Sequence, residues 1–266
     1  MTADWPGSSS GLVDPDVDPL LLQRTLYESG NPTRRWLHRS RRHWIREAIC
    51  RLGPGAERAI EFGPGSGVYL PTLAGVAKSV VGADIEDVYL VGLRNLQRRF
   101  PNVQLVRDDL TRSAFPDAHF DLVLCSEVIE HLGESSCALG EMRRLLRPGG
   151  VLILSTPQRY SPLELCSKVA LHPRMIGLTR RVYREPVVRT GHINLMTRQA
   201  LHRDLDRAGF VIRETYAAGA YLPLVAEALG ERALRIERAL DRRLRGSRLE
   251  WLLWTQFVIA TPDGPW

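Results

Sequence analysis

Lysine, cysteine pairs and long apolar runs are scarce in this sequence. Of the 36 basic residues, Lys78 and Lys168 are the two lysines, so arginine carries the formal charge of +6. We attribute this bias to genome composition rather than to an acidic partner. No run approaches the roughly 18 apolar residues that a membrane span needs. The sequence therefore predicts a soluble protein.

The few cysteines do not form a pattern that would hold a metal. They show neither a CxxC pair nor a metal-ligand spacing, and lie at Cys50, Cys125, Cys137 and Cys166. Residues 1–19 lack the basic and apolar regions of a secretory signal. We therefore expect reduced thiols in a cytoplasmic protein, and no metal site.

The bulk composition and length fit one globular core. The chain has 266 residues, of which 44% are hydrophobic and 25% charged. Residues 1–19, rich in Ser, Gly, Pro and Asp, predict a flexible tail. Residues 20–56 predict an N-terminal helical extension, with an amphipathic helix at 33–52. The remainder, 57–266, then forms one larger domain.

Short β-rich runs alternate with helical windows from residue 58 onward. Strands are expected at 58–62, 79–84, 103–107, 120–126, 151–156, 210–217 and 251–261, and helices at 67–76, 87–99, 127–132, 135–147, 197–208 and 222–244. Helices of crossover length between strands favour a parallel sheet covered on both faces. We therefore predict a Rossmann-like α/β fold with a seven-stranded, mostly parallel sheet. The glycines of "RPGG" at 147–150 are expected to end the helix before the fifth strand.

About forty residues after the fifth strand interrupt this alternation of strands and helices. The segment at about 157–196 contains no strand of its own, is too long for a plain connection, and is too apolar for a linker. We expect a lid insertion that faces the substrate.

A glycine-rich loop follows the first expected strand. In "AIEFGPGSG" the glycines are spaced GxGxG, whereas a dinucleotide fold needs GxGxxG. Glu61, just before them, would repel a pyrophosphate but suits a cationic group. Asp84 ends the next strand, where it can accept hydrogen bonds from ribose hydroxyls. These features together describe a ligand with a ribose, no phosphate and a positive charge, as S-adenosylmethionine has.

Four motifs in order extend this interpretation. They are "AIEFGPGSG", "VVGADIED", "VQLVRDDLTRSAFPDAHFDLVLCSEVIEHL" and "EMRRLLRPGGVLILSTP". The chain resembles the class I S-adenosylmethionine-dependent methyltransferases, within the branch that includes ubiquinone-type O-methyltransferases and natural-product methyltransferases. The resemblance covers roughly residues 58–217, and implies that 57–266 is a methyltransferase domain.

The resemblance also implies which residues hold the cofactor. The glycines would let the loop approach the methionyl group, Glu61 would lie near its ammonium, and Asp84 would bind the ribose. Asp109 would accept from the adenine amino group, with Asp108 as an alternative in register. The full implied set is Glu61, Gly63, Gly65, Gly67, Asp84, Ile85, Asp109, Leu110 and Ser126.

Two histidines are candidate bases for methyl transfer. The sulfonium is already activated, so alignment can suffice, and a base is needed where the nucleophile is poorly acidic. His131 in "SEVIEHL" follows the fourth strand, at the sheet edge where ligands of open α/β folds bind. His192 in "TGHINLMT" approaches from the lid side. For both, a structural role in packing or hydrogen bonding is the alternative.

The acceptor pocket is expected between the insertion and the N-terminal helices. Candidate lining residues are Tyr27, Trp36, Tyr160, Met175 and Met196, with ordinary packing as the alternative for each. Their apolar character favours an aromatic, terpenoid, polyketide or quinone-like acceptor. We predict methyl transfer to a hydroxyl of such a small molecule, as in secondary metabolism, with carbon or nitrogen as the alternative acceptor atom.

The sequence also bears on nucleic acid, a membrane surface and a second copy of the chain as partners. Amino-methylating nucleic-acid enzymes carry an Asn/Asp-Pro-Pro-aromatic motif after the fourth strand, where this chain has Ser126-Glu127-Val128-Ile129. We therefore expect no nucleic-acid partner. The arginine-rich helices at 33–52 and 222–244 resemble helices that lie on anionic lipid, which leaves peripheral membrane contact and a lipid-linked acceptor open. The alternative is that each packs its apolar face on the sheet. A homo-oligomer is also left open.

Overall fold

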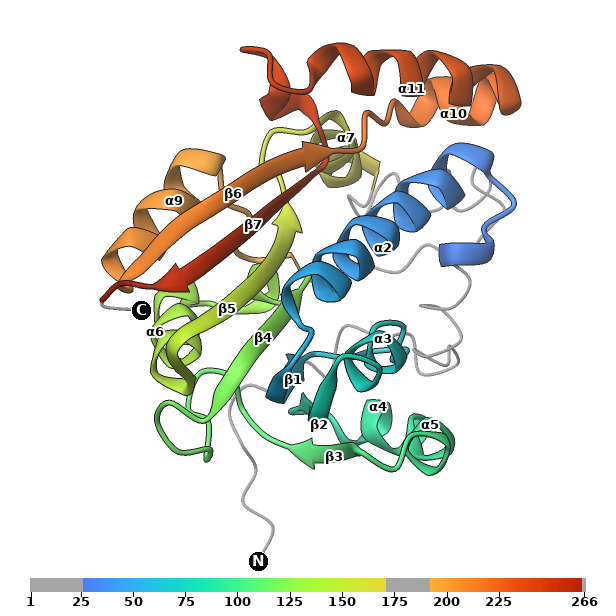
Figure 1. Ribbon diagram of the computed structural model, residues 1–266. Helices are drawn as coiled ribbons and strands as arrows, with labels where there is room; N and C mark the ends of the chain where they lie inside the picture. Colours follow the sequence, from blue (N-terminus) through green and yellow to red (C-terminus); the bar gives the residue numbers. More distant parts are fainter. Residues whose placement is uncertain (1–25, 171–191, 265–266) are drawn as a thin grey trace, which may run out of the picture.

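The computed structural model of the protein describes residues 26–170 and 192–264. Seven strands form one sheet in the order β3-β2-β1-β4-β5-β7-β6 (Figure 1). They are β1 Ala56–Phe62, β2 Ala77–Asp84, β3 Val103–Arg107, β4 Phe120–Ser126, β5 Leu146–Pro157, β6 Phe210–Ala218 and β7 Thr255–Pro262. The first five are parallel, and β7 runs antiparallel to both β5 and β6. The predicted seven-stranded, mostly parallel α/β fold is confirmed.

Helices cover both faces of this sheet. They are α2 Pro32–Leu52, α3 Leu70–Ala74, α4 Asp87–Gly92, α5 Arg94–Arg99, α6 Ser135–Leu145, α7 Pro162–Ala170, α9 Arg198–Arg207, α10 Pro223–Leu229 and α11 Glu231–Leu244, with 3-10 turns η1 Ile129–His131 and η2 Glu250–Leu252. Helices α2 and α3 pack on one face, and α6 and α9 on the other (Figure 1).

The central strand β4 shows why the core divides into two layers. Its side chains alternate between faces, so Leu122 and Leu124 join the cluster under α2 while Val123 and Cys125 join the cluster under α6. Every residue of β4 from Phe120 to Cys125 is buried. A strand covered on both faces reads as a continuous apolar run, which is why the sequence revealed it clearly.

Helix α2 belongs to the core of the fold. Asn31 caps it by accepting hydrogen bonds from the backbone N–H groups of the first turn, and Pro32 occupies the position where no N–H is needed. Its Ile45, Ala48 and Ile49 are buried against the sheet. The apolar face of α2 is therefore covered by protein, which is the alternative we gave to a lipid contact.

Several predicted elements have different bounds in the structure. The expected helix at 222–244 is two helices, because Gly230 adopts φ 49° and ψ −118°, a backbone conformation open mainly to glycine. The window at 87–99 also splits, at Leu93. The one at 127–132 contains a single 3-10 turn, and the strand expected from 251 begins at Thr255, after η2.

The prediction that glycines end the helix before β5 was wrong. Helix α6 ends at Leu145, and Leu146 already pairs with Phe120 of β4. The "RPGG" segment therefore lies within β5, where the register shifts between Phe120 and Leu122. Gly149 takes φ 78° at this irregularity.

The two ends of the predicted insertion meet at its base. Gln158 and Met196 form a parallel β-bridge, and Gln256 of β7 donates a hydrogen bond to the Met196 carbonyl at 3.1 Å. The expected tail at 1–19 and Met175 lie outside the described residues. Over the parts of the chain that the structure describes, no helix has the length and apolar character to cross a membrane.

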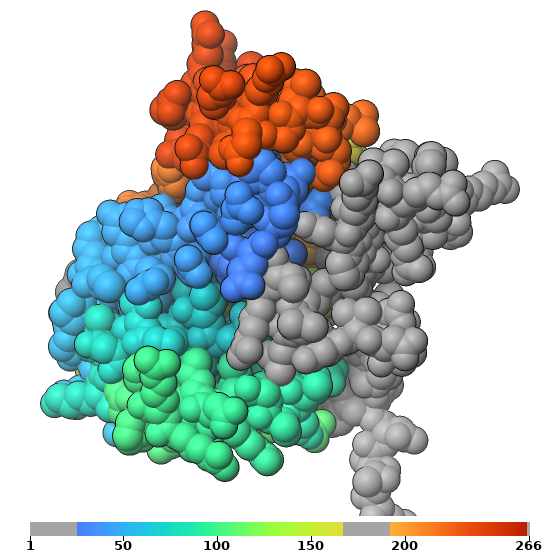
Figure 2. Space-filling model, turned by 90° about the vertical axis from the view of Figure 1, so that its right-hand side faces the viewer, coloured from blue at the N-terminus to red at the C-terminus, as the bar shows by residue number. Residues whose placement is uncertain are grey.

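The C-terminal helices cover the N-terminal half of α2. Figure 2 shows α10 and α11 lying directly against α2 on this face of the molecule. Glu237 and Asp241 of α11 are buried and accept hydrogen bonds from the backbone N–H groups of Leu222 and Gly219. These bonds hold the segment that follows β6 against α11.

Candidate cofactor and acceptor site

The glycine loop after β1 is packed too closely for side chains. Gly63, Gly65 and Gly67 have φ of 65°, 51° and 70°. A Cβ at Gly63 would lie 2.5 Å from Val128 Cγ2, and one at Gly67 would lie 2.6 Å from Leu93 Cδ2. Backbone conformation thus favours glycine at all three positions, and close approach adds to this at Gly63, beside the segment after β4, and at Gly67, beside Leu93.

Glu61 places a buried carboxylate beneath this loop. It is 2% exposed, and its Oε2 has no hydrogen-bond partner in the described part of the chain. Burial raises the pKa of Glu61 well above its usual range, and the charge of Asp84 adds to this effect. An unpaired buried carboxylate oxygen is costly, and a cationic amine nearby would offset that cost. The site therefore fits the ammonium of S-adenosylmethionine.

Asp84 ends the neighbouring strand β2. Its Oδ1 accepts a hydrogen bond from the backbone N–H of Glu86 at 2.9 Å. Desolvation raises the pKa of Asp84 to about 6, against an ordinary value of 3.8. Ile85 follows and is 43% exposed. The Asp84 carboxylate can accept hydrogen bonds from a ribose, and the exposed apolar side chain of Ile85 can pack on the attached base.

The raised pKa of Asp84 predicts a pH-dependent cofactor affinity. Without ligand, its contribution to folding stability is fully present below pH 3.8 and is lost as pH rises through about 6, because burial disfavours the carboxylate. Ribose hydroxyls donate to the ionised form, so cofactor binding should weaken as pH falls through about 6. Calorimetric titrations between pH 5 and 8 test this. The Asp84→Asn variant should show weaker binding with a flatter profile, and an unchanged profile would contradict the assignment.

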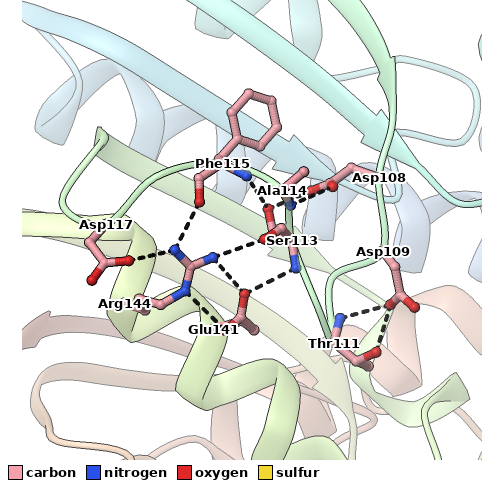
Figure 3. A network of polar contacts seen from close by, with 9 residues as sticks. All are labelled: Asp108, Asp109, Thr111, Ser113, Ala114, Phe115, Asp117, Glu141 and Arg144. Atoms are coloured by element: carbon pink, nitrogen blue, oxygen red, sulfur yellow. Dashed lines mark hydrogen bonds and ion pairs between the residues drawn. The ribbon is translucent and has the colours of Figure 1, made fainter.

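The loop after β3 distinguishes Asp108 from Asp109 (Figure 3). Both oxygens of Asp108 accept hydrogen bonds from within the loop, from Ser113 Oγ at 2.5 Å and from Ala114 N at 3.0 Å. Asp109 uses Oδ1 for both the N–H and the hydroxyl of Thr111, at 2.8 and 2.7 Å. Its second oxygen carries no bond in the drawn network, which favours Asp109 as the ligand-facing residue.

Arg144 of α6 fixes the rest of this loop. Its guanidinium donates to Glu141, to Asp117 and to the carbonyls of Ser113 and Phe115 (Figure 3). The loop conformation is therefore set from the α6 side. The neighbouring Leu110 is buried, so its backbone is the part that a ligand would meet.

The segment after β4 is held by an ion pair that is largely buried. Glu127 has φ 58°, unusual for a residue with a side chain, and its Oε2 lies 2.6 Å from Arg41 Nη1 of α2. Its Oε1 accepts from Ser155 Oγ at 3.0 Å, and Ser155 Oγ also lies 3.0 Å from Ser126 Oγ. Arg41 is 8% exposed, and its charge is balanced chiefly by Glu127.

His131 and His192 come together although 61 positions separate them. Their ring centroids are 5.1 Å apart in an edge-to-face arrangement. His131 Nε2 lies 3.9 Å from Oε1 of the fully buried Glu130, and His192 Nδ1 lies 3.2 Å from Glu164 Oε2. The contact between Gly63 and Val128 places this group beside the glycine loop. Both candidate bases therefore lie near the predicted cofactor site.

Four of the predicted acceptor residues fall within the described part of the chain, and they lie in different surroundings. Tyr27 lies under the Arg42 guanidinium, 5.1 Å from ring centre to Cζ, and Trp36 packs on a cluster with Tyr221 and Trp254. Tyr160 is 49% exposed and lines a pocket together with Trp251. Met196 is 4% exposed and belongs to the core under α6.

Three polar residues of this region were missed from the sequence. Arg41 occupies the apolar face of α2, four residues after Leu37 and four before Ile45, and an arginine at that spacing signals a buried partner. Glu130, which directly precedes His131, is fully buried, and nothing in the local sequence indicated this. Glu164 lies within the insertion and gave no sequence signal.

Comparison with known proteins decides the family. The profile of the family described as "Methyltransferase domain" matches residues 34–215, more than half of the chain. The chain belongs to this family. The expectation of an S-adenosylmethionine-dependent methyltransferase domain is thereby confirmed, and the glycine loop, Glu61 and Asp84 fit that cofactor.

Named relatives agree with this assignment. A Mycolicibacterium smegmatis protein named "Probable S-adenosylmethionine-dependent methyltransferase" is 28% identical over 78% of this chain and 66% of its own length. The demethylmenaquinone methyltransferase of Tropheryma whipplei strain Twist is 34% identical over 44% of this chain and 51% of its own. The chain thus covers less than two thirds of the length of these relatives.

A solved structure supports the fold. Magnesium protoporphyrin IX methyltransferase from Synechocystis, with bound S-adenosylhomocysteine, superposes with a TM-score of 0.60. The match covers 91% of this chain and 93% of the other at 16% identity. At this identity the likeness shows the fold of the methyltransferase domain.

Proposed function

We propose that the chain transfers the methyl group of S-adenosylmethionine to a hydroxyl of a small, largely apolar molecule. The observation that carries this proposal is the convergence of Glu130, His131 and His192 at the carboxyl end of β4, beside the glycine loop. Ligands of open α/β folds bind at this edge. The cofactor supplies a methyl group on a sulfonium that needs no further activation.

The cofactor half of the site consists of residues around the ends of β1, β2, β3 and β4. Glu61 would bind the amino group, Asp84 the ribose and Ile85 the base. The other residues that would contact the cofactor are Gly63, Gly65, Gly67, Asp109, Leu110 and Ser126. Their shared task is to fix the methyl group in line with the acceptor atom, since alignment supplies much of the rate of such a displacement.

The acceptor half contains a histidine and a carboxylate that can take up a proton from the acceptor. His192 Nδ1 lies 3.2 Å from the buried Glu164 carboxylate, which favours the tautomer with its proton on Nδ1 and the lone pair on Nε2. An imidazole held in this way can accept a hydroxyl proton, and Glu164 stabilises the resulting charge. Such an arrangement suits an alcohol or phenol, which must lose a proton as it is methylated. The name of the demethylmenaquinone relative supports a quinone-like class of acceptor.

Methyl transfer can be tested with deuterium-labelled cofactor. The full chain is incubated with phenols, quinols and matched compounds that lack a hydroxyl, and products are analysed by mass spectrometry. We expect the label on oxygen of hydroxyl-bearing apolar compounds. The His192→Gln variant should lower kcat by about 100-fold or more, the usual contribution of a general base.

The control variant is His43→Gln, at an exposed histidine on α2. It should retain full activity. Label found on carbon or nitrogen would replace the hydroxyl assignment with the alternative, and an undiminished kcat in His192→Gln would remove the base from the proposal.

A further inference from the structure

Glu130, His131 and His192 offer three ligand atoms in one place. One carboxylate oxygen and two imidazole nitrogens all lie within 4.8 Å of one another. Two imidazoles and a carboxylate are the donor set found in many sites for zinc and other first-row transition ions. Such sites leave further coordination positions open for water or substrate.

Glu130 points an unpaired oxygen into this group. The residue is fully buried, and its Oε2 accepts a hydrogen bond from Thr156 Oγ1 at 3.0 Å. Its Oε1 has no hydrogen-bond partner within 26–170 and 192–264, and lies 3.9 Å from His131 Nε2. A buried carboxylate oxygen without a donor is costly, and a cation at this point would satisfy it.

His192 is oriented as metal-binding histidines usually are. Its Nδ1 meets Glu164 Oε2 at 3.2 Å, and the other Glu164 oxygen accepts from Trp254 Nε1 at 3.0 Å. A carboxylate behind an imidazole fixes its tautomer and raises its basicity toward a metal on the opposite nitrogen. That nitrogen, Nε2, is therefore the one available to the group.

The backbone joins the two halves of the group. The N–H groups of Ile193 and Asn194 donate to the Glu130 carbonyl at 2.9 and 3.0 Å. His192 is thus tied directly to the turn that carries Glu130 and His131. By contrast, Glu127 is already paired with Arg41 and Ser155, so we do not count it as a ligand.

We propose that Glu130, His131 and His192 bind one divalent transition-metal ion, of the class of Zn²⁺ or Mn²⁺, on the acceptor side of the site. The binding claim stands on the geometry above, while its catalytic use rests on the proposed function. An ion there would lower the pKa of an acceptor hydroxyl. The hydroxyl proton then passes to water, the O–C bond forms as the S–C bond breaks, and S-adenosylhomocysteine leaves. With the ion bound, His192 acts as its ligand, and water takes the proton that the imidazole accepts when no ion is bound.

The expectation of no metal site rested on the cysteine pattern, and this set of ligands contains no cysteine. The histidines are 61 positions apart, and the acidic ligand precedes one of them directly. No short spacing motif results, because the site forms where the insertion returns to the end of β4.

Metal binding can be measured without methyl transfer. The full chain is treated with a chelator, dialysed, and titrated with Zn²⁺ and with Mn²⁺ by isothermal titration calorimetry. We expect one equivalent of at least one ion. His131→Gln and His192→Gln should each weaken binding by about 100-fold or more, since each removes a ligand, whereas Glu164→Gln should weaken it by about 10- to 100-fold through orientation.

The matched control is His43→Gln. His43 and Glu47 form an exposed histidine–carboxylate pair on α2, with His43 Nε2 3.7 Å from Glu47 Oε2, so this variant tests adventitious binding. It should leave the affinity unchanged, and thermal unfolding should show that all variants fold. Absence of stoichiometric binding, or unchanged affinity in both ligand variants, overturns the metal site even if labelled methyl transfer is observed. Stoichiometric binding without methyl transfer supports the site and counts against the proposed function.

Discussion

Replacing Asp84 with alanine is expected to weaken S-adenosylmethionine binding by at least about 100-fold. Two ribose hydroxyls donating to an ionised carboxylate contribute about 1.5–3 kcal/mol each, and each 1.4 kcal/mol is about tenfold in affinity. Asp84 is suited to this role because it ends β2 next to the glycine loop and lies beside the exposed Ile85. Calorimetric titration of the purified chain with the cofactor measures the change.

Asp87→Ala is the matched control for this measurement. Asp87 lies three residues further along the chain, at the start of α4, where it is exposed and paired with Arg107 at 3.4 Å. It should leave cofactor affinity unchanged. An unaltered affinity in Asp84→Ala, with Asp87→Ala also unaltered, would show that the ribose lies elsewhere and would undo the cofactor assignment.

Two strands of the parallel sheet could be predicted closely because short runs rich in Val and Leu leave a plain signal, and in β4 this run is buried on both faces. The ranges 103–107 and 120–126 agree fully with β3 and β4. The helices with different bounds broke at backbone features that periodicity does not record. At Gly230 the apolar spacing of 222–244 continues across a residue whose left-handed φ ends one helix and begins another.

The two halves of the site differ in how far the sequence predicts them. The residues proposed for the cofactor half lie at the ends of successive strands. Local motifs were therefore enough to predict that Glu61, the glycines and Asp84 lie at one edge of the sheet. The acceptor half forms from contacts between distant segments, such as His131 with His192 and Arg41 with Glu127. No local pattern encodes such pairs. Of the apolar candidates, Met196 lies in a packing cluster and Trp36 packs against one, which agrees with the packing alternative given for them.

Removal of the Arg41 charge is expected to cost about 3–5 kcal/mol of unfolding free energy. Loss of one partner from a buried ion pair leaves the other charge uncompensated in a low dielectric, and effects of this size are typical. Here the partner is Glu127, 2.6 Å away, with side-chain exposures of 10% for Arg41 and 17% for Glu127. Arg41 also stacks over Trp254, with Cζ 5.3 Å from the ring centre. Arg41→Met keeps the apolar stem and removes the charge.

Denaturant unfolding of Arg41→Met, Glu127→Gln and the double variant measures this pair. Because each single variant strands a buried partner, the double variant should lose less free energy than the two singles together. Arg46→Met, at an exposed arginine one turn further along α2, should change stability by less than about 0.5 kcal/mol. Additive losses, or a loss in Arg41→Met no larger than in Arg46→Met, would show that the ion pair does not hold α2 to the segment after β4. A large coupling would instead make α2 a structural support of the acceptor half, since Glu127 lies between the Ser126 and Glu130 positions of the site.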